Sequence, residues 1–398
     1  MERPFERPFE RSFTALESRT FDVLVIGGGI TGAGVARDAA MRGLSVAIVE
    51  KGDWANGTSS KSSRLIHGGI RYMEHGEIGL VRESVREREI LLRIAPHLVK
   101  SLAFTWPVYR GDRLPKWKLR IGLSMYDLLA GSSPVRRHHS LDVAQVLERE
   151  PSLRADGLTG GVSYFDAATD DAGLTRANVA SAVEHGAVAV SHAESKSMTT
   201  SAGKADGALI RGTFEETSVR VSARAVVSAT GPWQAKGTKG SHIVVDRARV
   251  GNHGAVTIAS PEDGRVMFVL PSSDRTVVGT TDIRTDETPD NVKASDAEVA
   301  YLLCAANAYF PDARLLSSDV METWAGIRPL ATAPAGTSPS SISREHRIFR
   351  DQSGVIVVTG GKLTTYRSMA ADVVDEVERS LGRKVIRAAT DEEALPQG

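Results

Sequence analysis

The most informative segment of the sequence begins with Asp22-Val-Leu-Val-Ile-Gly27-Gly28-Gly29-Ile-Thr-Gly32 and ends with Leu44-Ser-Val-Ala-Ile-Val-Glu50. The apolar residues 23–26 predict a buried parallel strand, followed by a helix that ends at the C′ glycine Gly43. Gly27, Gly29 and Gly32 have the spacing that lets a pyrophosphate approach the backbone at a helix N-terminus. Glu50 ends the second strand, 18 positions after Gly32, where a ribose needs an acceptor. Together these features predict a dinucleotide-binding fold.

Composition sets the class of protein. With 398 residues, of which 41% are hydrophobic and 25% charged, the chain is long enough for two domains with their own cores. Lys+Arg and Asp+Glu both number 49, so no basic excess favours nucleic acid as a partner. The single Cys304 excludes an intrachain disulfide and is expected to be a small core side chain. Since no ligand-spaced cluster of His, Cys or carboxylates occurs, no metal site is predicted.

The N-terminal segment and the hydropathy indicate location. No apolar run approaches the ~20 residues of a spanning helix, and the first twenty residues mix Arg with Glu, unlike a secretory or transit peptide. We therefore expect a cytoplasmic protein. Pro4 and Pro8 prevent a regular helix, so residues 1–19 are predicted to be a flexible tail. The alternative is an arm that touches lipid or a partner through Phe5, Phe9 and Phe13.

A second unusual run follows Glu50: Thr58-Ser59-Ser60-Lys-Ser62-Ser63-Arg64-Leu-Ile-His67-Gly68-Gly69-Ile-Arg71-Tyr72. A serine-rich loop can be a solvated connector. Paired glycines, however, let the backbone approach a flat ring, and an Arg-Tyr pair can hold an anion. The run therefore favours a binding loop.

This run resembles the FAD-dependent glycerol-3-phosphate dehydrogenases, the non-NAD enzymes that feed electrons to a quinone. Three later segments resemble the same family: Ala229-Thr-Gly-Pro-Trp233, Gly279-Thr-Thr-Asp282 and Gly360-Gly-Lys-Leu-Thr-Thr-Tyr-Arg367. They occur in the family's order between about residues 20 and 390. The resemblance implies an α/β protein with a Rossmann-type FAD-binding domain, like that of glutathione reductase and D-amino-acid oxidase, and an interleaved substrate domain on an antiparallel sheet.

The expected FAD-binding domain comprises residues 20–98, 160–236 and 325–390, and the expected substrate domain comprises 99–159 and 237–324. Short apolar strands separated by Gly, Pro, Asp and Asn follow Ser241, as in an antiparallel meander. The chain departs from the family pattern in two places. The segment between Trp233 and Gly240 is shorter than usual, and the usual C-terminal helical domain has no counterpart before Gly398.

The resemblance also implies the cofactor site, which combines both glycine turns with the loops beside them. Its predicted members are Gly27, Gly29, Gly32, Glu50, Thr58, Ser59, Ser60, Ser62, Ser63, His67, Gly68, Gly69, Thr230, Gly231, Gly360, Gly361, Lys362, Leu363 and Thr364. The helix that starts near Thr365 is expected to aim its N–H groups at the flavin edge that becomes negative on reduction.

Oxidation of an alcohol requires a hydride acceptor, a base and a grip on the rest of the substrate. The resemblance assigns the phosphate of the substrate to Arg71, Tyr72, Arg328 and Lys362, with Thr281 as a further hydrogen-bonding group and with Arg328 and Lys362 also catalytic. His242 is the candidate base, because an imidazole titrates near neutrality. An equally weighted alternative is that His242 is a structural residue whose ring is hydrogen-bonded within the protein.

Residues 116–129 predict a helix with a basic start, an aromatic Trp117 and large apolar side chains at near-helical spacing. Such a helix can lie in a bilayer interface or can pack on the core, and periodicity does not separate the two. A second helix is expected over 77–96. Asp170 and Asp171 are expected to cap a helix that ends at Gly186.

The functional hypothesis is oxidation of sn-glycerol 3-phosphate to dihydroxyacetone phosphate, with electrons passing from FAD to a membrane quinone. It requires peripheral attachment at the cytoplasmic face of the membrane. The alternatives are a flavin oxidase of the same superfamily that uses oxygen, and a non-catalytic flavin-binding protein. The sequence does not determine the oligomeric state, and a homodimer is one of the alternatives.

Overall fold

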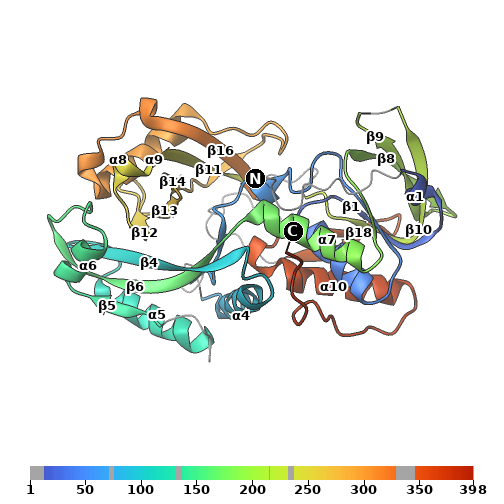
Figure 1. Cartoon of the computed structure of the whole chain (residues 1–398), viewed down its shortest axis with the longest axis horizontal. Coiled ribbons are helices and arrows are strands. Elements are labelled where there is room, and N and C mark those ends of the chain that lie inside the picture. Colours follow the sequence, from blue (N-terminus) through green and yellow to red (C-terminus); the bar gives the residue numbers. More distant parts are fainter. Residues whose placement is uncertain are drawn as a thin grey trace.

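The computed structural model describes residues 13–70, 76–130, 137–214, 216–231, 237–328 and 346–397. Two sheets build the two halves of the molecule, which lie at the right and the left of Figure 1. The chain passes repeatedly from one half to the other, as expected for two interleaved domains.

The eight-stranded sheet is the predicted nucleotide-binding layer. Five of its strands are parallel, in the order β18-β10-β1-β2-β7, and β17 adds an antiparallel edge. The β8–β9 hairpin extends β10. The strands are β1 (Phe21–Ile26), β2 (Val46–Val49), β7 (Val188–Val190), β8 (Ala193–Ser201), β9 (Lys204–Gly212), β10 (Ser218–Ser228), β17 (Arg347–Arg350) and β18 (Ile356–Thr359).

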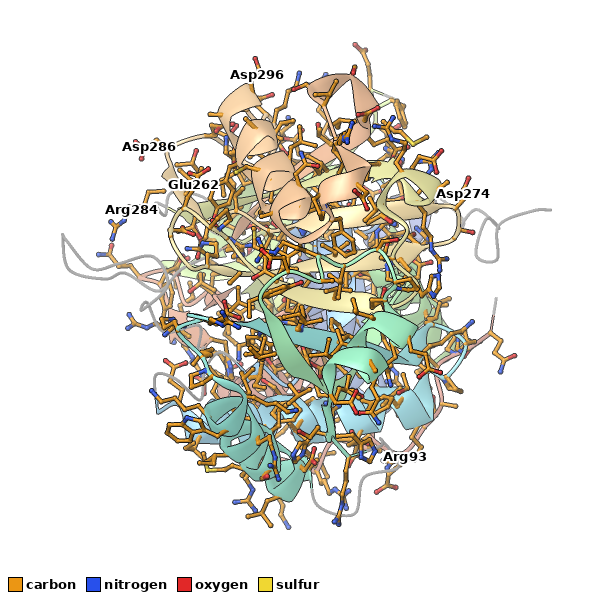
Figure 2. The ribbon with its side chains drawn as sticks, turned by 90° about the vertical axis from the view of Figure 1, so that its left-hand side faces the viewer. Arg93, Glu262, Asp274, Arg284, Asp286 and Asp296 are labelled. Atoms are coloured by element: carbon orange, nitrogen blue, oxygen red, sulfur yellow. The ribbon has the colours of Figure 1, made fainter. Side chains whose placement is uncertain are left out.

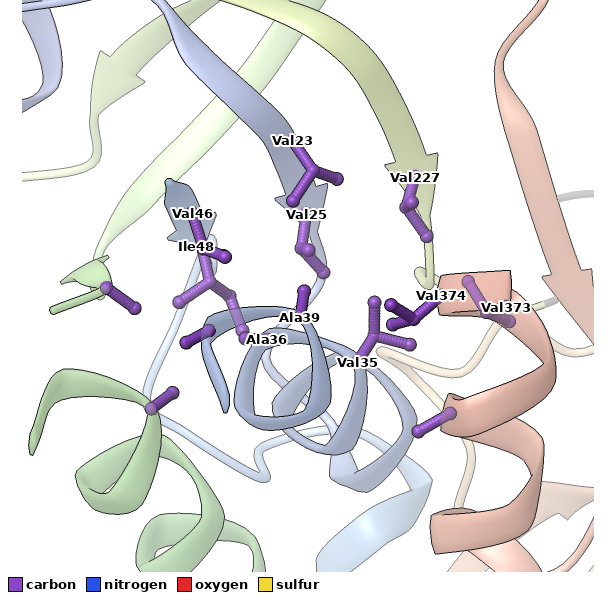
Figure 3. Packing of buried hydrophobic residues seen from close by; sticks show 14 of the residues in the cluster. Val23, Val25, Val35, Ala36, Ala39, Val46, Ile48, Val227, Val373 and Val374 are labelled. Carbon is purple, nitrogen blue, oxygen red and sulfur yellow. The ribbon is translucent and has the colours of Figure 1, made fainter. Parts of the chain in front are cut away.

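Helices α2 (Ile30–Met41), α7 (Asp171–Glu184) and α10 (Tyr366–Ser380) cover one face of this sheet. Figure 3 shows Val23 and Val25 of β1 facing Ala36 and Ala39 of α2. On the opposite face, α1 (Phe13–Glu17) and the β8–β9 hairpin pack against the same strands. Because both faces are covered, β1 and β2 are almost uniformly apolar, which is why their sequence predicts buried parallel strands.

The ten-stranded sheet is largely antiparallel and is the predicted substrate sheet. Its order is β15-β11-β14-β13-β12-β4-β6-β3, with β16 on β11 and β5 on β6. The strands are β3 (Leu65–Ile66), β4 (Val99–Tyr109), β5 (His139–Leu141), β6 (Leu158–Thr169), β11 (Gly237–Asp246), β12 (Ala255–Ala259), β13 (Val266–Ser272), β14 (Arg275–Gly279), β15 (Ile283–Thr285) and β16 (Val320–Arg328). The predicted meander is confirmed in β11 to β14.

Two helices cover one face of the second sheet and one covers the other. α6 (Val143–Arg149) and α9 (Asp296–Tyr309) share a core with β11 to β14, and α5 (Lys116–Ala130) packs on the opposite face. Figure 2 shows Asp296 at the outer end of α9, with Glu262, Arg284 and Asp286 at the rim. The remaining helices among the described residues are α4 (Ile78–Ile94), α8 (Arg247–Val250) and the short 3₁₀ turns η1 (Thr58–Ser60), η2 (Pro311–Ala313), η3 (Ser317–Asp319) and η5 (Leu363–Thr365).

Three expectations are corrected. β3 and most of β6 fall in segments expected to form the FAD-binding domain, but they pair within the ten-stranded sheet, because β6 pairs with β4 along its whole length. The tail ends earlier than residue 19, since α1 buries Leu16 completely in the core. Cys304 is exposed, because α9 turns its neighbours Leu303 and Ala305 inward instead. Phe5 and Phe9 lie outside the described residues.

Candidate functional site

The glycine turn after β1 has the backbone geometry that a dinucleotide site needs. Gly27 has a φ of +110°, and a Cβ there would lie 2.7 Å from the carbonyl oxygen of Ala229. A Cβ at Gly32 would overlap the carbonyl oxygen of Gly27. Only glycine therefore fits at both positions, and β1, the turn and α2 can meet closely. Gly29 is the N-cap of α2 and has no capping side chain of its own.

Glu50 lies just past the end of β2, where it was expected. One of its carboxylate oxygens accepts a hydrogen bond from Gly28 N at 2.6 Å, and the other accepts from Gly52 N at 2.9 Å. A carboxylate has about four acceptor positions, so it retains capacity for a ribose diol. The backbone contacts fix its direction beside the glycine turn. This arrangement fits the adenosine end of FAD.

Hydrogen bonds to three other elements, and one within the loop, fix the serine loop. Thr58 Oγ1 donates to Ile327 O in β16, and Ser59 Oγ accepts from Ile30 N at the start of α2. Ser60 Oγ makes a long bond of 3.4 Å to Gly57 O. Ser62 Oγ donates to Asp171 at the start of α7, at 2.9 Å. The predicted cofactor residues of this loop therefore form one fixed wall beside the N-terminus of α2.

The two aspartates at the start of α7 have different hydrogen-bond partners. Asp170 is the predicted cap, because its side chain accepts from Gly173 N at 2.9 Å. Asp171 instead holds Ser62, and burial raises the pKa of its carboxyl group while the Ser62 hydrogen bonds lower it. A Cβ at Gly173 would lie 2.5 Å from Asp170 Oδ2, so the cap and a larger residue there compete for space.

The two diglycine turns, 68–69 and 360–361, are connected by hydrogen bonds. His67 N donates to Thr364 Oγ1 and Thr364 Oγ1 donates to His67 O, both at 3.3 Å. Gly69, Gly360 and Gly361 have φ values of +76°, +77° and +84°, which favour glycine. Leu363 opens η5, which leads directly into α10. Segments about 290 residues apart are thus adjacent, as the resemblance required.

The other predicted cofactor residues lie around this junction. Lys362 precedes η5 and its Nζ donates to Ser84 Oγ of α4 at 3.4 Å. Gly231 has a φ of +76°, and a Cβ on it would meet no atom within 4 Å. Thr230 is exposed just beyond β10, with its hydroxyl oxygen 3.3 Å from that of Ser228. The predicted Arg71 and Tyr72 lie outside the described residues.

His242 is a buried residue of β11. Its Nε2 lies 2.8 Å from Ser63 Oγ, its ring stacks on Trp324 at a centroid distance of 5.0 Å, and its Nδ1 has no partner among the described residues. Burial, with further effects of Arg328 and Arg64, lowers its pKa to about 3. The expectation that His242 titrates near neutrality is therefore corrected: burial, and next the charges of Arg328 and Arg64, disfavour the protonated ring.

Arg328 and Thr281 belong to a hydrogen-bonded turn rather than to an open surface. Arg328 donates to Thr280 Oγ1 at 2.9 Å, to Thr281 O at 3.1 Å and to Asp282 Oδ1 at 3.0 Å. Thr281 Oγ1 donates to Glu298 and accepts from Ser241 N, both at 2.8 Å. The hydroxyl proton of Thr281 is thus already committed within the protein. The guanidinium of Arg328 is held in one direction.

Sequence reasoning did not identify Glu298, Trp324 or Asp171 as supports of this site. Although burial raises the pKa of Glu298, hydrogen bonds from Ser295 N, Ser241, Lys239 and Thr281 lower it to about 2. Ser295 and Glu298 form a capping box, whose Ser-x-x-Glu spacing is visible in the sequence. That signal predicts a helix start but not the contact with Thr281.

The part of the chain described by the structure fits FAD at several independent points: the glycine turn, the Glu50 carboxylate, the serine loop and the two joined diglycine turns. Within the same residues, no group of three metal-ligating side chains gathers. None of the described helices has both the length and the apolar character needed to cross a bilayer.

Comparison with known proteins agrees with this geometry. The model of the FAD dependent oxidoreductase family (DAO) matches residues 22–370. The aerobic glycerol-3-phosphate dehydrogenase of Staphylococcus saprophyticus is 38% identical over 394 residues, covering 94% of this chain and 71% of that protein. The enzyme of the same name from Bacillus subtilis is 38% identical over 382 residues, covering 92% of this chain and 68% of that protein.

Solved structures give the same relationship. The glycerol-3-phosphate dehydrogenase of Bacillus halodurans, complexed with FAD, superposes with a TM-score of 0.77 at 33% identity, covering 94% of this chain and 68% of that one. The L-α-glycerophosphate oxidase of Mycoplasma pneumoniae superposes with a TM-score of 0.69 at 16% identity, covering 96% of this chain and 100% of that one. The second likeness shows the fold alone.

Proposed function

The chain belongs to the FAD-dependent glycerol-3-phosphate dehydrogenases, and on this basis we propose that it oxidises sn-glycerol 3-phosphate to dihydroxyacetone phosphate and passes the electrons to a quinone. FAD is its cofactor, and when bound it accepts the hydride that leaves the alcohol carbon. The protein residues then have to hold the flavin ring, bind the phosphate and accept the hydroxyl proton.

One observation carries the proposal beyond the family relationship. The hydrogen bonds between His67 and Thr364 bring the two diglycine turns together at the start of α10. Glycine backbone can approach a flat ring closely, and the start of a helix favours negative charge. We therefore assign the isoalloxazine ring to the junction of these turns.

The substrate phosphate is assigned to cations around that junction. Arg328 is oriented by the Thr280–Asp282 turn, and Lys362 follows the second diglycine directly. A guanidinium that the protein already orients loses little side-chain entropy when it binds a phosphate. Arg71 and Tyr72, which follow Gly68-Gly69 closely in the sequence, are the other proposed phosphate-binding residues.

The proton acceptor is assigned to His242. A neutral imidazole is the form that accepts a proton, and the low pKa keeps His242 neutral over the whole physiological range. Arg328 contributes to this low pKa, so a phosphate dianion bound at Arg328 would raise it. Ser63 orients the ring through its 2.8 Å bond to Nε2.

Peripheral membrane contact is assigned to one face of α5. Trp117, Ile121, Met125 and Leu128 are 60%, 62%, 40% and 78% exposed, whereas Leu119 and Leu123 on the other face are buried. The exposed four are three or four residues apart, so they form one apolar stripe. Lys118 and Arg120 stand beside it, as in helices that lie among lipid head groups. This stripe favours the interfacial interpretation of the helix.

Anaerobic mixing of the FAD-loaded protein with glycerol 3-phosphate tests the activity. We expect the visible absorbance of the oxidised flavin to disappear, and to return when a soluble quinone is added. Formation of peroxide in air at the rate of substrate oxidation would instead identify an oxidase. A flavin that stays oxidised in excess substrate would identify a non-catalytic flavoprotein.

Lys362→Met tests the phosphate assignment, with Lys51→Met as its control. Lys51 forms an exposed ion pair with Asp290, on the surface. Loss of a charge-assisted contact to phosphate should raise KM by about tenfold or more. Equal KM values for the two variants would remove Lys362 from the site.

A further inference from the structure

A cluster of three buried polar side chains meets the backbone of Gly68. Asp166 Oδ1 accepts from Tyr126 Oη at 2.6 Å, from Arg88 Nη1 at 2.6 Å and from Gly68 N at 3.1 Å. Tyr126 Oη also accepts from Gly68 N, at 2.9 Å. The three side chains come from β6, α4 and α5, so three separate elements converge on one backbone N–H group.

The cluster begins where the sheet ladder ends. β3 pairs with β6 only at Leu65 and Ile66, opposite Ala168 and Ala167. Asp166 precedes Ala167 in β6. Its side chain accepts a hydrogen bond from Gly68 N, just beyond the end of β3, so the two segments remain in contact after the backbone pairing stops. The chain is thus held after it leaves the sheet.

The peptide between His67 and Gly68 is held at both ends. Its N–H donates to Asp166 and Tyr126, and its C=O accepts from Thr364 Oγ1. In a trans peptide these two groups point in opposite directions within one plane, so two anchors fix the orientation of that plane. A Cβ at Gly68 would overlap Tyr126 Oη and lie 2.5 Å from Val85 Cγ2, so the packing is close.

A purely structural role explains this cluster poorly. Arg88, Tyr126 and Asp166 are 1%, 2% and 3% exposed. Burial raises the pKa of the Asp166 carboxyl, and Arg88 opposes this effect. Taking such an ion pair out of water costs free energy that apolar side chains of similar volume would not incur. Buried polar groups of this kind give one defined geometry instead, which suits a turn that must be held in register with a ligand.

We propose that Asp166, Tyr126 and Arg88 are positioning residues that fix the His67–Gly68 peptide, and with it the first diglycine turn, for hydride transfer. The inference rests on the proposed function, which assigns the flavin ring to this turn. We assign these three residues no contact with the substrate or with the reacting atoms. They act through the backbone of Gly68.

Hydrogen exchange in the wild-type protein gives a first test that needs no variant. The Gly68 amide should be strongly protected with and without FAD, because its hydrogen bonds are internal to the protein. Exchange at the rate of an exposed loop amide would overturn the proposal.

Tyr126→Phe, compared with Tyr164→Phe, gives the second test. Tyr164 is equally buried on β6, and its hydroxyl lies 2.8 Å from Thr257 Oγ1. Tyr126→Phe removes the hydroxyl that contacts Asp166, Arg88 and Gly68 N, and Tyr164→Phe removes the one that contacts Thr257, so both variants lose buried hydrogen bonds and the free energy of unfolding is measured for each. Only Tyr126→Phe should speed exchange at Gly68 and alter the visible spectrum of bound FAD. It should also slow flavin reduction by glycerol 3-phosphate by about ten- to a hundredfold at little change in KM.

The outcomes separate the two proposals. If wild-type flavin is not reduced by glycerol 3-phosphate, the proposed function fails, while the exchange rate and the FAD spectrum still report on positioning. Equal effects of the two variants on exchange, spectrum and reduction would leave only a general loss of stability and would refute the positioning role. An unchanged Tyr126→Phe protein would refute it as well.

Discussion

Burial of His242 predicts a specific dependence of stability on pH. Its pKa is 6.5 when exposed and about 3 in the folded protein. Between these values the unfolded chain binds a proton that the folded protein does not, so the free energy of unfolding falls as the pH falls. The slope is about 1.4 kcal/mol per pH unit, and the total is on the order of 5 kcal/mol. The contribution is fully present above pH 6.5 and is lost towards pH 3.

The measurement is urea unfolding of the FAD-loaded protein at a series of pH values, compared with His242→Phe. Phenylalanine keeps a ring against Trp324 but does not titrate. Asp38, whose pKa burial raises to about 6, acts in the opposite direction, but it is common to both proteins and cancels in the difference. Between pH 6.5 and 5 the wild type should lose about 2 kcal/mol more than the variant. Parallel curves would show that the imidazole is hydrated and that its pKa is not lowered in the folded protein.

Three further outcomes are expected. Gly68→Ala should lower the free energy of unfolding by about 1–3 kcal/mol in urea titrations, since its Cβ has no space, whereas Gly57→Ala, whose Cβ meets no atom within 4 Å, should change it by less than about 0.5 kcal/mol. Glu50→Gln should raise the Kd for FAD about tenfold in a fluorescence titration, because Glu50 loses its charge; an unchanged Kd would contradict the ribose assignment. Replacing both Ile121 and Leu128 by Ser should weaken co-sedimentation with vesicles of mixed neutral and anionic phospholipid about tenfold, and unaltered binding would exclude the α5 stripe.

The sequence predicted those parts of the molecule whose signals are local. The strand at 21–26, the helix from Ile30 and the strand at 46–49 are encoded by apolar runs and glycines within 30 residues. Gly68-Gly69 was singled out as a pair of glycines beside Arg71 and Tyr72, and Gly360-Gly361 was identified through the family resemblance. Their adjacency was implied by a family resemblance, not by periodicity, because no local pattern records a contact between His67 and Thr364.

The features that the sequence did not predict depend on tertiary contacts. Arg88, Tyr126 and Asp166 lie in three separate elements, and each alone resembles an ordinary helix or strand residue. β6 was divided between two domains because its apolar residues do not say which strand they pair with. His242 was expected to titrate near neutrality, but its pKa depends on burial and on Arg328, 86 positions later in the sequence.

We propose that the joined diglycine turns hold a flavin ring that takes a hydride from glycerol 3-phosphate. The most direct measurement is anaerobic titration of the FAD-loaded protein with glycerol 3-phosphate, followed by visible absorbance. We expect complete loss of the oxidised-flavin spectrum, and much slower loss in a Gly361→Ala protein, whose Cβ would overlap Met369. An oxidised spectrum that persists in excess substrate, while dithionite still reduces the same flavin, would contradict it.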